Sequence, residues 1–140
     1  MVRGKYRSIL SRGKEATAPA FTKHFEDVMK IYGNQCVVNL LSPTKESEKI
    51  LMDAYEEQLK AAKYSEGQVK YHAFDFAQQL KNGMKYNLIG PLLLDNLESD
   101  LLGFGSFILD QDGNVLLTQK GTFRVNCLDC LDRLLQADLT

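Results

Sequence analysis

The sequence has few cysteines, no excess of charge of either sign and no long apolar run. Three cysteines are too few, and odd in number, for a disulfide framework, which favours a reducing, cytosolic setting. Seventeen basic and 18 acidic residues leave a net charge of −1, which excludes a general attraction to nucleic acid. No apolar run approaches the ~20 residues of a membrane-spanning helix, and residues 1–12 lack the apolar block of a signal peptide.

The 140 residues, of which 44% are hydrophobic, suffice for one domain with an apolar core. The chain has no internal repeat, low-complexity tract or linker. Its first 14 residues carry five basic side chains ahead of the first acidic one: Arg3, Lys5, Arg7, Arg12 and Lys14. This basic arm, residues 1–14, is either a solvated terminus or a segment that meets phosphates or an anionic membrane surface.

Hydrophobic periodicity predicts alternating helices and strands. Apolar residues at helical spacing begin after Pro19, and Gly33 ends that helix. The apolar run 36–41 then predicts a buried strand. The further predicted elements are a helix over 46–63, a strand over 69–74, helical stretches over 76–80 and 85–102, hairpin strands over 107–109 and 115–118, and a last strand over 122–126. Gly90-Pro91 is expected to start, kink or divide the second helical stretch.

This order predicts an α/β fold with a mixed sheet. The strand, helix and strand over 36–74 are typical of a βαβ unit with a parallel pair and a right-handed crossover. Asp112-Gly113 between two apolar runs is a strong hairpin signal. The C-terminal hairpin then leads, through the last strand, into a cluster of cysteines.

Cys127 and Arg133 give the pattern Cys-x5-Arg directly after the last predicted strand. A loop of this length, residues 127–133, can curl so that its N–H groups surround a phosphate while the arginine closes the ring. A helix that begins at the end of the loop and the arginine would both favour a thiolate. Such a thiolate can attack phosphorus and form a phosphocysteine, which water then hydrolyses. This chemistry needs no metal and no other cofactor.

The spacing alone leaves other interpretations open. Cys127-x-x-Cys130 could be a redox pair or half of a zinc site. A zinc site would need two further ligands, and only Cys36, His24 and His72 remain, none of them at finger spacing. The two cysteines could also be buried beside a solvated acidic loop.

Neither histidine is expected to be catalytic. His24 is expected at the surface or boundary of the first helix, between charged neighbours. His72 is expected in core or edge packing, on the opposite face of its strand from Tyr71.

The segment 124–133, RVNCLDCLDR, resembles the catalytic signature of the SAC-type phosphoinositide phosphatases, R-x-N-C-x-D-C-L-D-R-T-N. The matching positions are Arg124, Asn126, Cys127, Asp129, Cys130, Leu131, Asp132 and Arg133. Two upstream segments, SRGKEATAPAF over 11–21 and VVNLL over 37–41, resemble the SAC domain of synaptojanins in particular. The similarity extends over nearly the whole chain, from about Tyr6 to Arg133.

The resemblance implies that Cys127 is the nucleophile and Arg133 the phosphate clamp. Asp129 or Asp132 would protonate the leaving inositol oxygen, and the pattern does not distinguish between them. The phosphate would be surrounded by the loop as a whole: Cys127, Leu128, Asp129, Cys130, Leu131, Asp132 and Arg133.

Three neighbouring positions have supporting roles under the same resemblance. Arg124 and Asn126 would brace the loop rather than touch the substrate. Cys130 would be a small packing residue, or could form a protective disulfide with Cys127 under oxidation.

The resemblance also implies partners and a location. The partners would be phosphoinositide head groups at a cytosolic membrane surface, with no nucleic acid and no transmembrane segment, and the protein would be cytoplasmic and peripheral at membranes. Full-length relatives carry further SAC and inositol 5-phosphatase regions. Residues 1–140 are therefore expected to be part of a SAC catalytic domain, with apolar faces left uncovered and poor solubility.

The chain departs from the signature directly after Arg133. Leu134-Leu135 stand where the signature has Thr-Asn, so a hydroxyl that can hydrogen-bond the thiolate is lost. The alternative to an active phosphatase is therefore a catalytically inactive fragment, or a module that binds phosphoinositides without hydrolysing them.

Overall fold

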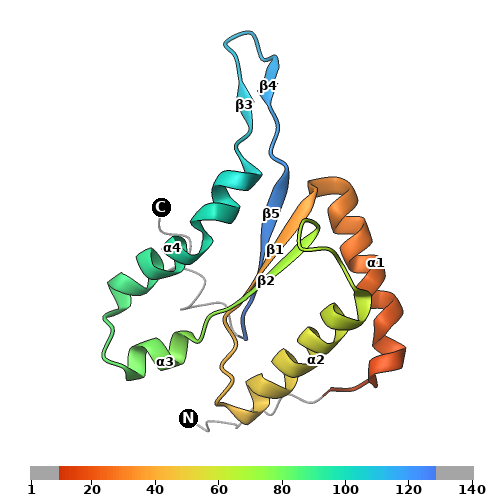
Figure 1. The fold of residues 1–140 in the computed structure, drawn as a ribbon, viewed down its shortest axis with the longest axis vertical. Helices are drawn as coiled ribbons and strands as arrows, with labels where there is room; N and C mark the ends of the chain where they lie inside the picture. The colour runs from red at the N-terminus through yellow and green to blue at the C-terminus, as the bar shows by residue number, and fades with distance from the viewer. Residues whose placement is uncertain (1–9, 129–140) are drawn as a thin grey trace, which may run out of the picture.

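A parallel sheet of three strands organises residues 10–128, the part of the chain that the computed structural model describes (Figure 1). The elements are α1 (Lys14–Tyr32), β1 (Asn34–Asn39), α2 (Glu46–Ala62), β2 (Val69–Ala73), α3 (Phe76–Lys81), α4 (Tyr86–Phe104), β3 (Ile108–Leu109), β4 (Val115–Leu117) and β5 (Gly121–Asn126). The strand order is β2-β1-β5, and both neighbouring pairs are parallel. The predicted α/β class and the βαβ unit β1-α2-β2 are confirmed.

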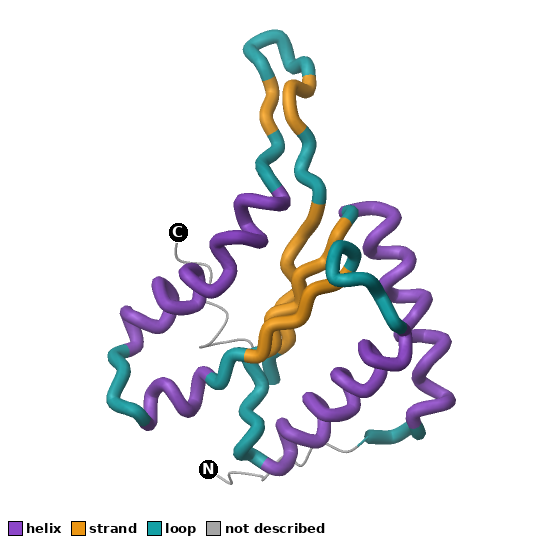
Figure 2. Tube along the Cα trace, in the orientation of Figure 1, coloured by secondary structure: helices purple, strands orange, loops and turns teal. Residues whose placement is uncertain are grey.

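Helices cover both faces of the sheet because its two crossover connections run in opposite directions along the strand order. From β1 the chain passes through α2 to β2 on one side of β1, and from β2 it passes through α3 and α4 to β5 on the other side. Crossovers between parallel strands are almost always right-handed, so crossovers in opposite directions leave their helices on opposite faces. Accordingly, α1 and α2 lie on one face, and α3 and α4 lie on the other (Figure 2).

The face under α4 holds the main apolar core. The inner side of α4 contributes Ile89, Leu93, Leu97 and Phe104. These side chains pack with Cys36 and Val38 of β1, with the chain just beyond β1 and β2, and with the partly buried Phe123 and Val125 of β5. Full burial of such a side chain stabilises the fold by about 1.5–3 kcal/mol.

The opposite face is built largely from aromatic rings. Phe25 of α1 is fully buried, and its ring centroid lies 5.0 Å from that of Phe21 and 5.4 Å from that of Tyr64. Tyr55 of α2 stacks on Tyr71 of β2 at 6.4 Å. These contacts fasten α1 and α2 to the sheet, since aromatic pairs at such separations add stability beyond their buried area.

The predicted hairpin is confirmed, but the mixed sheet is wrong. β3 and β4 pair with each other in a separate antiparallel sheet, and the main sheet is parallel throughout. Gly113 takes the positive φ of 84° that the turn requires, and the Asp110 carboxylate accepts hydrogen bonds from the backbone N–H groups of Asp112 and Asn114. The hairpin projects from the end of the sheet (Figure 1).

Two predicted boundaries are wrong, those of α1 and β1. α1 begins at Lys14, so Pro19 lies inside the helix and the last residue of the predicted basic arm is already helical. α4 is one helix through Pro91, so of the three effects expected of Gly90-Pro91 a start and a division are excluded. β1 ends at Asn39 because both neighbouring strands end level with it, although Leu40 and Leu41 remain buried beyond it.

Candidate functional site

The candidate site lies at the carboxyl ends of β1 and β5. Asn39 and Asn126 are partners in register at these ends, and Cys127 directly follows β5. In open parallel sheets, ligands bind in the crevice outside the carboxyl ends of the strands, where neighbouring crossovers go to opposite faces. The crossovers on the two sides of β1 take that course, so the sheet topology favours a ligand site here.

The side chains of β5, which carries the first residues of the signature, point alternately to the two faces of the sheet. Phe123 and Val125 face α4 and join the apolar core. Arg124, one residue between them, therefore faces α1 and α2, as does Asn126. The β5 strand thus presents the polar part of Arg-x-Asn-Cys on the aromatic face of the sheet.

Arg124 is held by a histidine 100 residues earlier in the chain. The Nη1 atom of Arg124 lies 2.7 Å from Nε2 of His24, which projects from α1. Burial lowers the pKa of His24 from its ordinary value, and the charge of Arg124 lowers it further. The ring therefore favours its neutral form, in which Nε2 can accept a hydrogen bond from the guanidinium.

A second polar side chain comes from α2. The Tyr55 ring lies near Arg124 and Asn126, and burial is the main cause that raises the pKa of its hydroxyl, while Arg124 opposes the rise. Within residues 10–128, neither the Tyr55 hydroxyl nor the Arg124 Nε atom has a hydrogen-bond partner of standard geometry. The Tyr55 hydroxyl, Arg124 and Asn126 thus form a group of polar side chains on the α1 and α2 face, at the carboxyl end of β5.

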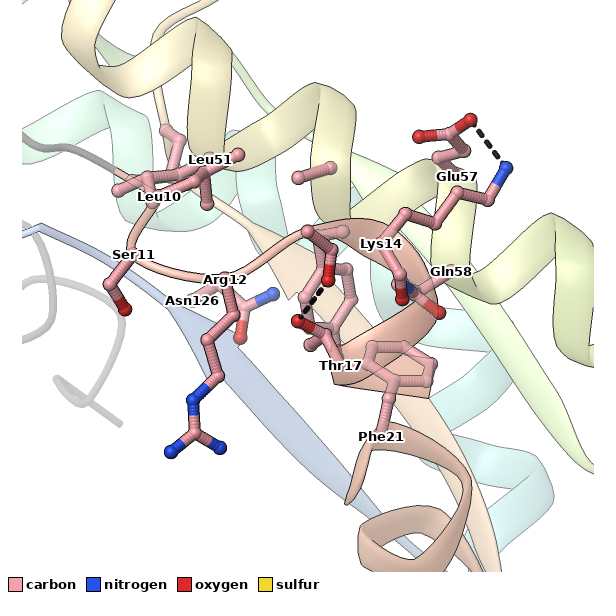
Figure 3. Close-up of a pocket in the computed structure, with 14 residues that line it drawn as sticks. Leu10, Ser11, Arg12, Lys14, Thr17, Phe21, Leu51, Glu57, Gln58 and Asn126 are labelled. Atoms are coloured by element: carbon pink, nitrogen blue, oxygen red, sulfur yellow. Dashed lines mark hydrogen bonds and ion pairs between the residues drawn. The ribbon is translucent and has the colours of Figure 1, made fainter. Parts of the chain in front are cut away.

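A cavity of about 700 Å³ adjoins Asn126 (Figure 3). It is lined by Leu10, Ser11, Arg12, Gly13, Lys14, Thr17, Phe21, Leu41, Leu51, Ala54, Tyr55, Glu57, Gln58 and Asn126. The segment that leads into α1 crosses it and is tied to α2, because Gln58 Nε2 donates a hydrogen bond of 2.9 Å to the carbonyl of Lys14. The cavity therefore combines an apolar floor with backbone and side-chain polar groups, which is typical of small-molecule sites.

The two basic side chains at this cavity, Lys14 and Arg12, differ in their ion pairs within residues 10–128. Lys14 forms an ion pair with Glu57 across the cavity mouth. Arg12 is exposed and makes no ion pair with any residue in the range 10–128. Among the described residues of the predicted basic arm, 10–14, Arg12 is therefore the basic side chain without an ion pair in the described range, and its position at the cavity suits contact with an anion.

The predicted loop is described only in its first two residues. Cys127 is partly buried and Leu128 is 45% exposed. The other loop residues of the prediction, Asp129, Cys130, Leu131, Asp132 and Arg133, lie outside the described residues, as does the basic arm up to residue 9. The geometry of the phosphate loop therefore stays a prediction.

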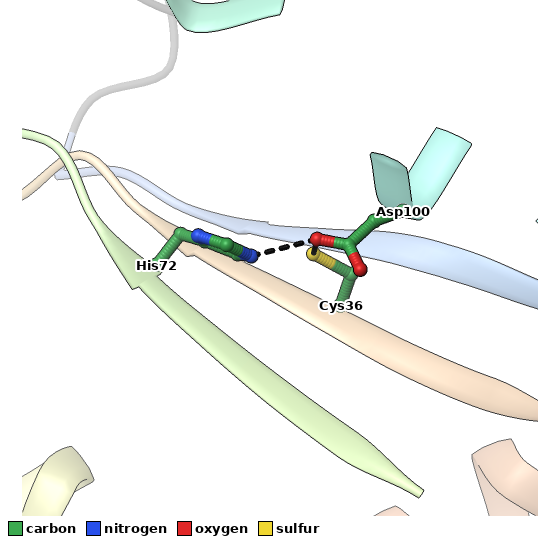
Figure 4. Close-up of side chains that lie close together, drawn as sticks. All are labelled: Cys36, His72 and Asp100. Carbon is green, nitrogen blue, oxygen red and sulfur yellow. Dashed lines mark hydrogen bonds and ion pairs between the residues drawn. The ribbon is translucent and has the colours of Figure 1, made fainter. Parts of the chain in front are cut away.

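A second polar cluster lies on the other face of the sheet, under α4 (Figure 4). Asp100 is 3% exposed and forms ion pairs with Lys70 and with His72, whose Nε2 lies 2.8 Å from Oδ2. Cys36 Sγ lies 3.9 Å from the same oxygen. The hydrogen bonds and charges of Lys70 and His72 outweigh burial and lower the pKa of Asp100.

The sequence analysis placed both histidines on their elements but missed their partners. His24 is a boundary residue and His72 lies on an edge strand opposite Tyr71, as predicted. The missed signal for the second cluster was Asp100, which continues the inward stripe of α4 at the spacing of Leu93, Leu97 and Phe104. An acidic residue on an apolar stripe indicates a buried partner.

Among residues 10–128, no helix combines the length and the apolar character needed to cross a bilayer.

Comparison with known proteins agrees with the resemblance in the sequence. The SacI homology domain profile matches residues 2–81, more than half of the chain. Synaptojanin-1 of Mus musculus is 41% identical over 130 residues, which are 93% of this chain and 8% of that protein. Phosphatidylinositol-3-phosphatase SAC1-B of Danio rerio is 39% identical over 113 residues, 81% of this chain and 18% of that protein.

A third relative, phosphatidylinositide phosphatase SAC2 of Mus musculus, is 36% identical over 91% of this chain and 11% of its own length. No solved structure matches the chain. The chain thus spans a small part of each of these relatives, while most of its own residues align with them. The chain belongs to the SacI homology (SAC) domain family.

Proposed function

We propose that this chain is the catalytic segment of a phosphoinositide phosphatase, which hydrolyses a phosphomonoester on an inositol head group. The observation that carries the proposal is the position of Asn126-Cys127 at the carboxyl end of β5, level with the end of β1 and beside the 700 Å³ cavity. A parallel sheet supports phosphate sites at this end. Membership of the SAC family supports the inositol lipid as the substrate class.

In the first step the Cys127 thiolate attacks phosphorus in line. The S–P bond forms as the bond from phosphorus to the inositol oxygen breaks, and Asp129 or Asp132 gives its proton to that leaving oxygen. Arg133 and the loop N–H groups stabilise the charge on the other phosphate oxygens.

In the second step water attacks the phosphorus of the phosphocysteine. The S–P bond breaks, the thiolate is regenerated, and inorganic phosphate leaves, while the carboxylate that lost its proton takes one from the attacking water. The thiolate is the nucleophile and a carboxyl group moves the proton, so the proposed cycle runs on this chain's own residues.

Arg124 and Asn126 are proposed to brace the loop. Arg124 is anchored to α1 through His24, and Asn126 ends β5 beside the cavity. Leu128, Cys130 and Leu131 would contribute backbone N–H groups. The exposed Arg12 supports contact with an anionic lipid head group, which would place the protein at a cytosolic membrane surface as a peripheral protein.

The test is phosphate release from short-chain phosphatidylinositol monophosphates. We expect the unaltered chain to release phosphate and Cys127→Ser, with the same circular dichroism spectrum, to release none. Leu134→Thr restores the hydroxyl of the family signature, and we expect it to accelerate breakdown of the phosphocysteine and raise turnover. Equal background release from all three proteins would refute hydrolysis by this polypeptide.

One observation favours a second candidate, a phosphoinositide-binding module. Leu134 stands where the family signature has threonine, and Arg12 is unpaired within residues 10–128 beside the cavity. In that case vesicles that contain phosphatidylinositol monophosphate should bind the chain without hydrolysis. Binding should fall with salt and in Arg12→Gln and Arg133→Gln, whereas equal binding to neutral vesicles would rule this function out.

A further inference from the structure

Cys36, His72 and Asp100 bring a sulfur, a nitrogen and an oxygen atom together under α4 (Figure 4). They come from β1, β2 and α4, and the ligand atoms they offer all lie within 4.8 Å of one another. Cys36 and Asp100 are buried, and the His72 side chain is 35% exposed at the sheet edge. We propose that these three side chains form a binding site for a divalent metal ion of the zinc type.

The spacing of the three ligand atoms suits a tetrahedral ion. His72 Nε2 lies 2.8 Å and Cys36 Sγ lies 3.9 Å from Asp100 Oδ2. Around zinc, bonds of about 2.0–2.3 Å at tetrahedral angles put neighbouring ligand atoms about 3–4 Å apart. The His72–Asp100 pair must open by a few tenths of an ångström on this scale, and the ion then replaces their hydrogen bond. The Cys36 and His72 ligand atoms already lie within 4.8 Å of each other.

The donor set selects the class of metal. A thiolate, an imidazole and one carboxylate suit zinc and cobalt, whereas magnesium and calcium prefer sites made of oxygen atoms alone. On binding, Cys36 Sγ gives an electron pair to the ion as its proton leaves to water. The Nε2 proton that bonds to Asp100 also leaves, to Nδ1 or to water, so that the Nε2 lone pair can bind the ion. Burial raises the pKa of Cys36 to about 12, so the ion has to displace a proton from this thiol.

The surrounding residues leave one carboxylate oxygen for the ion and provide access to it. Lys70 pairs with Oδ1 of Asp100, while Oδ2 faces Cys36 and His72. A ligating carboxylate commonly has such an outer partner on its second oxygen. A cavity of about 170 Å³, lined in part by Lys70, Asp100 and Gly103, opens to solvent beside Asp100.

The site is independent of the proposed phosphatase chemistry. Cys36 and His72 face α4, whereas Arg124 and Asn126 face α1 and α2 on the opposite side of the sheet. An ion here would join three elements that are otherwise held by packing and by the charges on Asp100. Its expected effect is therefore on stability.

The experiment titrates the untagged chain with Co²⁺ and then with Zn²⁺. We expect thiolate-to-cobalt charge-transfer absorption that Zn²⁺ abolishes, and a rise in melting temperature with Zn²⁺. The Cys127→Ser/Cys130→Ser double variant should keep both signals, because it removes only the other two thiols. His72→Gln, at a partly exposed edge position, should weaken Co²⁺ binding at least tenfold without loss of the fold.

Cys36→Ser should lose the charge-transfer absorption, and its circular dichroism spectrum will show whether it folds. If that variant does not fold, His72→Gln and the double variant decide the matter, since His72 is partly exposed and the double variant leaves all three proposed ligands in place. Absorption that disappears in the double variant would assign the ion to Cys127 and Cys130 and overturn the proposal. Absence of thiolate-to-cobalt absorption from the unaltered chain, or unchanged affinity in His72→Gln, would overturn it as well.

Discussion

The Nε2 atom of His24 lies 2.7 Å from the Nη1 atom of Arg124, so a side chain of α1 holds one from the strand that leads to Cys127. The guanidinium has only donors, so the imidazole nitrogen has to accept. A protonated His24 would place two cations in contact at the point where α1 meets β5. The pair therefore holds together only while His24 is neutral.

Stability should fall in mildly acid solution because of this pair. The pKa of His24 is lowered in the folded state, first by burial and then by Arg124, while Asp27 raises it. In the unfolded chain the ordinary value of about 6.5 applies, so the unfolded state binds more protons in the window below it. The contribution of the neutral ring is complete above pH 6.5 and is lost as pH falls toward the folded pKa.

His24→Gln isolates this contribution, because the amide oxygen still accepts from Arg124 and does not titrate. Urea unfolding of both proteins between pH 7.5 and pH 5 is the measurement. The difference in unfolding free energy should shift in favour of the variant as pH falls below 6.5, and the carboxylates common to both proteins cancel. Parallel curves over the whole range would contradict a neutral His24.

Gly33 is expected to be intolerant of any side chain. It has φ of 74°, and a Cβ atom at this position would lie 2.3 Å from the carbonyl oxygen of Lys120. That oxygen accepts the hydrogen bond of Asn34 at the start of β1, so it cannot move without disturbing the pairing of β1 with β5. Gly33→Ala should therefore lower the unfolding free energy through both backbone strain and the clash.

Gly83→Ala is the matched control. Gly83 has φ of 85°, and a Cβ there would meet no atom within 4 Å. It should cost only the left-handed backbone strain, about 1–2 kcal/mol. Chemical denaturation gives the loss of unfolding free energy in each variant, and the difference between the two losses measures the cost of the clash. Equal losses would show that the Lys120 carbonyl moves aside without cost.

Local pattern predicted the elements well, and it predicted their boundaries and pairing less well. The apolar runs around Val37 and Val69 and the Asp112-Gly113 turn each carry their signal within a few residues. The separation of the hairpin from the main sheet depends on where β5 meets β1, which pairs Gly121 with Asn34, 87 positions earlier in the chain. The sequence predicted a helix start near Pro19 and a start, kink or division at Gly90-Pro91, whereas α1 and α4 each continue through their proline and pack on the sheet.

The candidate site was predicted in part for the same reason. The position of Cys127 directly after a strand could be predicted, because the pattern that indicates the strand lies in the few residues before it. The contact of His24 with Arg124 and the cluster around Asp100 join residues 28–100 positions apart. Neither could be predicted without the register that sets Cys36 beside Lys70 and Val37 beside Arg124.

Glu48 is expected to be the most sensitive acidic residue of α2. Its side chain is 1% exposed, and Oε2 accepts a hydrogen bond of 2.9 Å from the backbone N–H of the buried Ser42. Glu48→Ala leaves that N–H without its carboxylate partner, and a buried unsatisfied donor costs about 1–3 kcal/mol. Chemical denaturation measures the loss.

The control for Glu48 is on the same helix. Asp53 forms an exposed ion pair with Lys49, in which both side chains are about half exposed. Exposed pairs of this kind contribute little, so Asp53→Ala should leave the denaturation midpoint nearly unchanged. A loss as large as that of Glu48→Ala would mean that helix propensity or net charge, rather than the bond to Ser42, causes the effect.

Self-association is expected to start at the hairpin. Large apolar side chains of β3, β4 and their flanks are exposed by 43–65%: Phe107, Ile108, Leu109, Val115, Leu116 and Leu117. An apolar patch on a two-stranded sheet that pairs with no other strand among residues 10–128 favours association with other chains. The isolated chain should therefore form oligomers, measurable by light scattering, in line with the poor solubility predicted from its sequence.

Leu116→Lys and Ile31→Lys separate the patch from apolar exposure in general. Leu116 is 65% exposed within the hairpin patch, and Ile31 is 70% exposed on α1, away from the hairpin. Both variants add the same charge, so a general gain in solubility would affect them equally. Only Leu116→Lys should reduce the scattering mass, because only it places a charge within the strand surface that would pair. A monomeric unaltered chain, or equal reduction by the two variants, would rule out the hairpin as the site of association.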